Sequence, residues 1–113
     1  MTKKLALLIV SLLVLFFSAP AFAQQSEAVI LYENDVHCAV DGYSKLLAIK
    51  NEISEGGNYV GVVSGGDFVQ GGTLGAVSKG EYIVNLMNKV GYDAIALGNH
   101  EFDYQLPRLT ELN

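Results

Sequence analysis

The sequence predicts an α/β protein built on a mostly parallel sheet, in the order strand, helix, strand, helix, strand. Three short, mostly apolar segments, at residues 28–32, 59–63 and 93–97, are typical of strands. The segments between them place apolar residues at helical spacing. Because strands that alternate with helices are joined by right-handed crossovers, the strands are expected to run parallel.

The first crossover is expected to be one helix over residues 43–55. The strand before it, residues 28–32, is apolar throughout and is therefore expected to be buried. Two glycines, Gly56 and Gly57, are typical of the end of a helix. The apolar face of this helix is expected to comprise Leu46, Ile49 and Ile53.

The second crossover is expected to be a single helix over residues 79–90, and a third helix is expected to open at 106–112. Ser78 and Glu81 have the spacing of a capping box at the start of the second helix, and Gly91 suits its end. The buried face of the second helix is expected to comprise Ile83, Leu86, Met87 and Val90.

Residues 1–23 have the pattern of a secretory signal peptide. Lys3 and Lys4 precede an apolar run at 5–17, and small residues lead to Ala23, where cleavage is expected. The apolar run is shorter than the about 20 residues that a membrane-spanning helix needs. We therefore expect export to the bacterial periplasm, the cell surface or the medium, with no transmembrane span after cleavage.

Composition narrows the classes of partner and of fold. The 113 residues carry a formal charge of −5, and no basic cluster follows the signal peptide. This balance argues against nucleic acid as a partner. The single cysteine excludes an internal disulfide. Residues 24–113 are expected to form one domain that stops inside a third crossover, and therefore to be the N-terminal part of a longer, truncated domain.

Polar side chains that can bind metals follow each predicted strand. In open α/β sheets, functional groups gather in the loops at the carboxyl ends of the strands. Carboxylate, imidazole and amide groups in combination suit Zn, Mn, Fe, Co or Mg. The candidates are Asp35 and His37 after the first strand, Asp67 after the second, and Asn99, His100 and Asp103 after the third.

Taken singly, these residues have other interpretations. Asp35 or Asp67 alone is more often a turn or helix-cap residue, and His37 alone is more often a solvated loop histidine. The glycine-rich stretch at 65–72 fits neither the dinucleotide fingerprint nor the Walker pattern. Three further acids are expected to be solvated or to support the ligands rather than bind metal: Glu33, Asp41 and Glu101.

Three loop motifs, in this order, resemble those of the calcineurin-like metallophosphoesterases. They are Asn-Asp-Val-His at 34–37, Gly-Gly-Asp-Phe-Val-Gln-Gly at 65–71 and Gly-Asn-His-Glu-Phe-Asp at 98–103. The segments between the last two motifs, with Lys79-Gly80-Glu81, Leu86-Met87-Asn88 and Gly91-Tyr92-Asp93-Ala94, are similar to the secreted 5′-nucleotidase branch of this family. The resemblance implies the N-terminal half of a metallophosphoesterase-type layered sheet, incomplete as given, and a small-molecule nucleotide or phosphoester substrate.

The resemblance also implies a role for each candidate. Asp35 and His37 would hold one of two divalent ions. Asp67 would bridge the two ions, and Asn99 would bind the second. Such a pair of ions activates a shared water for in-line attack on phosphorus. His100 matches the catalytic histidine of the family, and Asp103, three residues on, can accept its ring N–H and fix its tautomer.

Two departures from the family pattern bear on activity. Cys38 stands where the family often has glycine, and we expect an inert thiol there rather than a ligand. The family draws further histidine ligands and its nucleoside-binding aromatic residues from later segments, so the 113 residues alone are expected to be inactive. The alternatives are a cyclic-nucleotide phosphodiesterase or UDP-sugar hydrolase of the same superfamily, or a non-catalytic exported metal-binding protein.

Overall fold

A computed structural model describes residues 27–112. The predicted signal peptide, residues 1–23, lies outside the described residues. The elements are, in chain order, β1 (Ala28–Glu33), α2 (Asp41–Glu55), β2 (Tyr59–Ser64), α3 (Gly72–Ser78), α4 (Glu81–Val90), β3 (Ala94–Ile95), the 3₁₀ helix η1 (His100–Phe102) and α5 (Gln105–Glu111). Among residues 27–112, no helix is both long enough and apolar enough to cross a bilayer.

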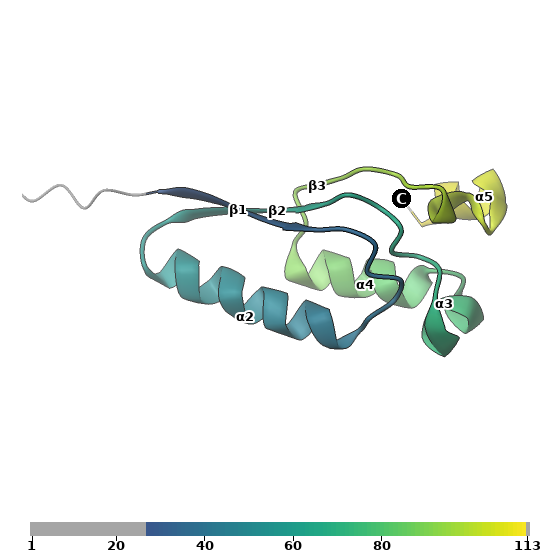
Figure 1. The fold of residues 1–113 in the computed structure, drawn as a ribbon, viewed down its shortest axis with the longest axis horizontal. Helices are drawn as coiled ribbons and strands as arrows, with labels where there is room; N and C mark the ends of the chain where they lie inside the picture. Colours follow the sequence, from purple (N-terminus) through teal and green to yellow (C-terminus); the bar gives the residue numbers. More distant parts are fainter. Residues whose placement is uncertain (1–26, 113) are drawn as a thin grey trace, which may run out of the picture.

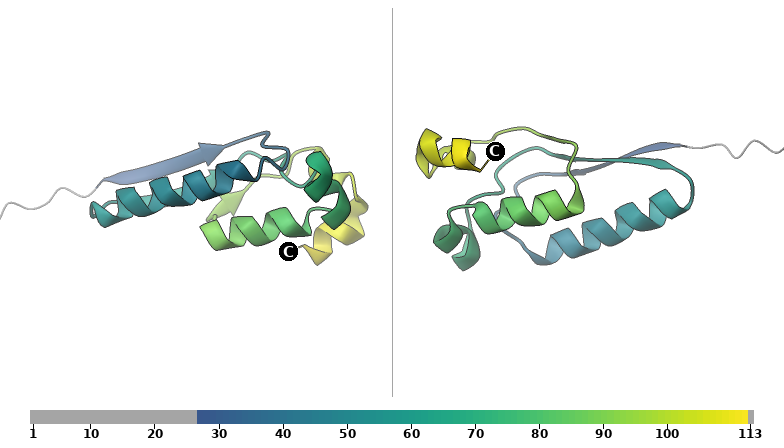
Figure 2. Two further views of the ribbon diagram at one scale, coloured as in Figure 1. Left: turned by 90° about the horizontal axis from the view of Figure 1, so that it is seen from below. Right: turned by 180° about the vertical axis from the view of Figure 1, so that it is seen from behind.

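The three strands form one parallel sheet in the order β1, β2, β3. Leu31 is in register with Val62, and Val63 with Ala94. Helices α2 and α4 lie on the same face of this sheet (Figure 1). Two further views show the same layering, with α5 at the end of the molecule toward which the strands run (Figure 2). The predicted α/β class and parallel topology are confirmed.

The core lies between the sheet and α4. Ile83, Met87 and Val90 are buried on one face of α4, as predicted, and Leu86 is partly buried. The residues that complete this core are Val62 of β2, Phe68 and Val69 of the loop after β2, and Cys38 and Tyr43 near the start of α2. Because the loop after β2 contributes two core residues, its path is fixed by packing as well as by hydrogen bonds.

The opposite face of the sheet is uncovered in the described part of the chain. Burial alternates along β1, and Ile30 and Tyr32 are 63% and 66% exposed. The prediction of a buried first strand is therefore wrong for one of its faces, because helices cover the other face only. The third strand is also shorter than predicted, since β3 comprises Ala94 and Ile95 alone.

The second crossover holds two helices where one was predicted. The additional helix, α3, ends at Lys79 and Gly80, whose φ angles of 49° and 85° are left-handed and cannot continue a helix. The predicted capping box does not form, since Gly80 is the N-cap of α4. Instead, the Ser78 hydroxyl donates to the Leu74 carbonyl at 2.7 Å and accepts the Tyr82 N–H at 3.3 Å, linking the two helices.

Helix α2 begins two residues before its predicted start and is anchored to the end of α4. Leu46 and Ile53 of its predicted apolar face are partly buried, whereas Ile49 is 46% exposed. The Lys50 ammonium donates to the carbonyls of Val90 and Gly91, both at 2.8 Å. A cation at this position satisfies carbonyls that have no partner within the helix and complements the helix dipole.

Candidate metal centre

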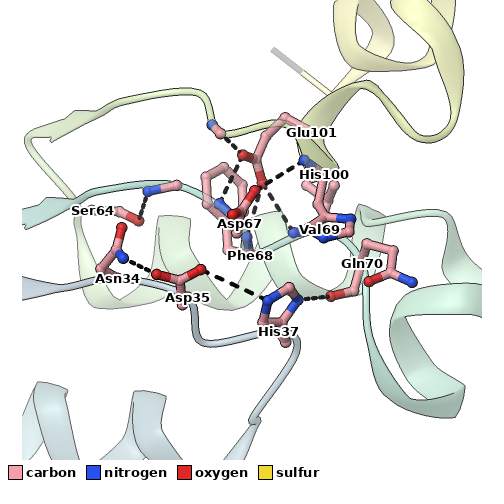
Figure 3. A network of polar contacts seen from close by, with 12 residues as sticks. Asn34, Asp35, His37, Ser64, Asp67, Phe68, Val69, Gln70, His100 and Glu101 are labelled. Carbon is pink, nitrogen blue, oxygen red and sulfur yellow. Dashed lines mark hydrogen bonds and ion pairs between the residues drawn. The ribbon is translucent and has the colours of Figure 1, made fainter.

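The candidate site lies at the carboxyl ends of the strands, where the loops after β1 and β2 continue to pair. The Asp35 N–H donates to the Gly66 carbonyl at 3.1 Å, and the His37 N–H donates to the Asp67 carbonyl at 3.0 Å. These bonds extend the parallel pairing of β1 and β2 into the loops. They bring the two predicted ligand-bearing loops side by side, as Figure 3 shows.

Three predicted ligands meet in this place. One donor atom each from Asp35, His37 and Asp67 lies within 4.8 Å of the others. Their backbones share a left-handed conformation, with φ of 55°, 42° and 59°. This conformation costs a non-glycine residue on the order of 1–3 kcal/mol and is concentrated at functional sites, and Asp and His are among the residues that tolerate it best. This backbone conformation could not be predicted from the sequence pattern.

The tautomer of His37 is fixed by the loop after β2. Nδ1 lies 3.2 Å from the Gln70 carbonyl, which can only accept, so Nδ1 carries the proton and Nε2 keeps its lone pair. Nε2 lies 3.9 Å from Oδ1 of Asp35. An imidazole lone pair directed at a carboxylate is favourable only with a proton or a cation between them. The donor set therefore fits a divalent ion with nitrogen and oxygen ligands.

The two carboxylates are each oriented by a neighbour. The Asn34 amide donates to Oδ2 of Asp35. The His100 N–H donates to Oδ1 of Asp67 at 2.9 Å, which ties the loop after β3 to the loop after β2. Gly98 lies so close to this carboxylate that a Cβ atom at position 98 would overlap Oδ1 and Cγ of Asp67. Glycine is therefore required there by close approach rather than by its φ angle.

His100 and Asp103 form an ion pair beside the cluster. Nδ1 of His100 lies 2.7 Å from Oδ2 of Asp103. The hydrogen bond to Asp103 raises the pKa of His100, and the charges of Asp103, Asp67 and Glu101 raise it further, against an opposing effect of desolvation. The ring also packs edge-on against His37, with centroids 5.0 Å apart. The structure thus places the predicted His-Asp pair at the predicted ligands.

Asn99 comes from the third loop, at the N-cap of η1 and directly before His100 in the chain. Its carbonyl accepts the N–H of Phe102 at 3.2 Å, which starts the 3₁₀ turn. The next residue, His100, donates its N–H to Asp67, so Asn99 is one residue along the chain from a direct contact with the Asp-His-Asp group. Its role as a metal ligand stays a prediction.

Glu101 has a structural role at the site that its sequence context does not reveal. It is buried, at 2% exposure, and its carboxylate accepts N–H bonds from the loops after β2 and β3. Of the two predicted possibilities, solvation is wrong and support of the ligand loops is what the contacts show. Nothing in its spacing marks this role, because hydrogen bonds to backbone amides leave no pattern in a sequence.

Cys38 is a buried residue packed against the loop after β2. Its thiol donates to the Phe68 carbonyl at 3.2 Å, and burial raises its pKa. A protonated thiol engaged with a carbonyl is a poor ligand and a slow nucleophile. The φ angle of Cys38 is 62°, a left-handed value that favours glycine, which is the residue that the family resemblance leads us to expect at this position.

Fold and site together define an α/β protein with a candidate divalent-metal centre at the carboxyl edge of its sheet. Residues 28–112 match the family described as calcineurin-like phosphoesterase, and the chain belongs to this family. Members of the family are metal-dependent phosphoester hydrolases.

Curated proteins that are similar to this chain include 5′-nucleotidases and a nucleotide phosphoesterase. The chain is 34% identical to the 5′-nucleotidase of Bos taurus, over 80% of this chain and 20% of that protein. It is 34% identical to the snake venom 5′-nucleotidase of Gloydius brevicauda, over 75% of this chain and 17% of that protein. It is 31% identical to the trifunctional nucleotide phosphoesterase protein YfkN of Bacillus subtilis, over 66% of this chain and 5% of that protein. The chain spans a fifth or less of the length of these relatives.

Proposed function

We propose that the protein to which this chain belongs is a metal-dependent phosphohydrolase that releases phosphate from nucleotides. The names of the relatives, 5′-nucleotidase and nucleotide phosphoesterase, support this substrate class. In this proposal residues 24–113 form the N-terminal part of the catalytic domain. The match covers a fifth or less of those relatives, so the remaining ligands and the groups that recognise base and sugar are assigned to other segments.

Four residues of this chain are proposed to bind two divalent ions. Asp35 and His37 bind one ion, and Asp67 bridges to the other. Asn99 is the other residue of this chain that binds the second ion. The Asp-His-Asp group, with all three donor atoms within 4.8 Å, supports the assignment. When bound, such a pair of ions supplies a nucleophile at neutral pH and neutralises charge on the phosphoryl oxygens.

His100 is proposed to act on the phosphoryl group or the leaving oxygen. With Nδ1 held by Asp103, the protonated ring presents its Nε2–H away from that pair. An N–H donor on a cationic ring stabilises negative charge that develops on a phosphoryl or leaving oxygen, and it can protonate the leaving group. Asp103 orients the ring and favours the charged form that this role needs.

The observation that carries the proposal is the meeting of Asp35, His37 and Asp67, with the His100–Asp103 pair beside them. The test is phosphate release from adenosine 5′-monophosphate by the purified full-length protein. We expect activity that a chelator abolishes and that added divalent metal restores. Asp67→Asn should remove it, whereas Asp41→Asn, at an exposed position in the first turn of α2, should not. Full activity of Asp67→Asn would contradict the two-ion assignment.

We also propose that the protein is exported, with residues 1–23 as the signal peptide. The support is the sequence pattern alone: a basic start, an apolar run and small residues before Ala23. N-terminal sequencing of the mature protein from its host should begin at Gln24. A mature protein that keeps Met1 would contradict export by this route.

A further inference from the structure

We infer that Glu101 is a positioning residue that holds Asp67 in the geometry needed to bind metal. The inference deepens the proposed function and rests on it. Glu101 contacts neither a metal nor a substrate in this assignment. It acts on the backbone that carries Asp67, which its carboxylate contacts directly (Figure 3).

The contacts of the Glu101 carboxylate are all with backbone N–H groups. Oε2 accepts from Asp67 at 2.8 Å and from Gly98 at 2.6 Å. Oε1 accepts from Phe68 at 2.8 Å and from Val69 at 3.3 Å. One buried side chain therefore satisfies three consecutive amides of the loop after β2 and one amide of the loop after β3.

These amides have no strand or helix to pair with, because the loop turns away from the sheet at Asp67. The φ of Asp67 is left-handed, at 59°, and the bonds that Phe68 and Val69 donate to Glu101 are buried. A buried N–H without an acceptor is strongly unfavourable. Without the Glu101 carboxylate, the loop would therefore be expected to leave this conformation, and the Asp67 side chain would move with it.

The same glutamate couples the second and third loops. Glu101 and His100 are adjacent in η1, and the His100 N–H donates to Oδ1 of Asp67 while Glu101 holds the Asp67 N–H. Two consecutive residues therefore hold Asp67: Glu101 binds its backbone N–H, and His100 binds its carboxylate. The Gly98 amide, held by the same Oε2 atom, keeps the third loop close enough for both contacts.

The discriminating substitution is Glu101→Gln, which keeps the size of the side chain. A glutamine can present one oxygen to two of the four N–H groups, but its NH₂ group then faces the other two donors. The loop loses acceptors while the packing volume stays the same. The matched control is Glu55→Gln, at an exposed position at the end of α2. Glu101→Asp keeps the charge and shortens the reach, so it should restore part of the loss.

The experiment is a calorimetric titration of the metal-free full-length protein with Mn²⁺, followed by steady-state kinetics with adenosine 5′-monophosphate. For Glu101→Gln we expect Mn²⁺ affinity to fall by about 10–100-fold, the usual effect of removing a group that orients a ligand. At saturating Mn²⁺, kcat should stay reduced while KM changes little, since no substrate contact is removed. Glu55→Gln should match the wild type in both measurements.

Two outcomes would overturn the inference, and they differ from failure of the proposed function. If folded Glu101→Gln, verified by circular dichroism, binds Mn²⁺ within about twofold of the wild type, Glu101 does not position Asp67. If Glu101→Gln does not fold, Glu101→Asp takes its place: its shorter side chain cannot reach all four N–H groups, so its Mn²⁺ affinity should lie clearly below that of the wild type, and an affinity within about twofold of the wild type overturns the inference. If the wild type itself neither binds Mn²⁺ nor hydrolyses the nucleotide, the proposed function fails as well.

Discussion

Gly98 and Asp67 are in direct contact, and no methyl group fits between them. A Cβ atom at position 98 would overlap the Asp67 carboxylate. We predict that Gly98→Ala displaces this side chain and lowers the affinity of the full-length protein for Mn²⁺ by about tenfold or more, the loss expected when a ligand is misoriented. A calorimetric titration measures this. Wild-type affinity in Gly98→Ala would show that the Asp67 side chain does not bind metal in the orientation seen here.

The control for that substitution is Gly42→Ala. Gly42 lies in the first turn of α2, and a Cβ atom there would have nothing within 4 Å. Alanine is preferred over glycine in a helix by about 0.5–1 kcal/mol, so this variant should keep wild-type Mn²⁺ affinity and melt at a slightly higher temperature. The pair of variants separates the effect of a methyl group at the site from the effect of a methyl group elsewhere.

The His100–Asp103 pair predicts how activity depends on pH. The hydrogen bond to Asp103, together with nearby negative charge, raises the pKa of His100 above its ordinary value of 6.5. A histidine that acts in its charged form should then remain active above pH 6.5, and activity should fall as the pH passes its raised pKa. Asp103→Asn removes the negative acceptor, so the alkaline fall in kcat/KM should move to lower pH.

The pH–rate profile of the two proteins checks this prediction. Asp41→Asn, far from the pair along the chain and exposed on α2, should leave the profile unchanged. An alkaline limb that is the same in the wild type and in Asp103→Asn would show that Asp103 does not tune His100.

Lys50 offers a test of stability rather than of activity. Its ammonium donates to the carbonyls of Val90, the last residue of α4, and of Gly91, the C-cap that follows it, at 2.8 Å each. Lys50→Met removes these bonds and the favourable charge at the helix end, so the free energy of unfolding should fall by about 1–3 kcal/mol. Thermal unfolding of the full-length protein measures the change. Lys45→Met, at an exposed position of α2, should melt within a degree or two of the wild type.

The thiol of Cys38 should react slowly in the native protein. It is buried, it donates to the Phe68 carbonyl, and burial raises its pKa, all of which keep it from the reactive thiolate form. Labelling with a thiol-reactive chromophore should therefore be slow in buffer and fast in denaturant. Rapid labelling of the native protein, at the rate seen in denaturant, would contradict the packing described for this loop.

The sequence predicted the elements that depend on local pattern and missed those that depend on distant contacts. Strands β1 and β2 and helix α4 follow from β-branched runs and a helical stripe, and the structure has them within a residue or two of the predicted bounds. Helix α3 was missed because it is short and carries glycines at Gly72 and Gly75. The third strand is shorter than predicted, and the residues after it contact the loop after β2 through the side chain of Glu101.

The candidate ligands could be predicted because their side chains have oxygen or nitrogen donor atoms and because they follow the strands, whose carboxyl ends meet at one edge of the sheet. Asp35, His37 and Asp67 do meet, as the parallel topology required. The role of Glu101 could not be predicted, since its partners are main-chain amides, which every residue type except proline offers. The left-handed backbone of these loops could not be predicted either, because the three ligand positions are occupied by Asp35, His37 and Asp67 and not by glycine.

The left-handed backbone at Asp35, His37 and Asp67 limits which residues these positions can accept. Asparagine, aspartate and histidine are enriched severalfold in this conformation, whereas β-branched and bulky residues fit it poorly. Those tolerated side chains are also ones that carry oxygen or nitrogen donors. A β-branched or bulky residue at any of the three sites would therefore strain the loop in addition to removing a donor atom. The shape of the loops and the chemistry of metal binding therefore favour the same few side chains.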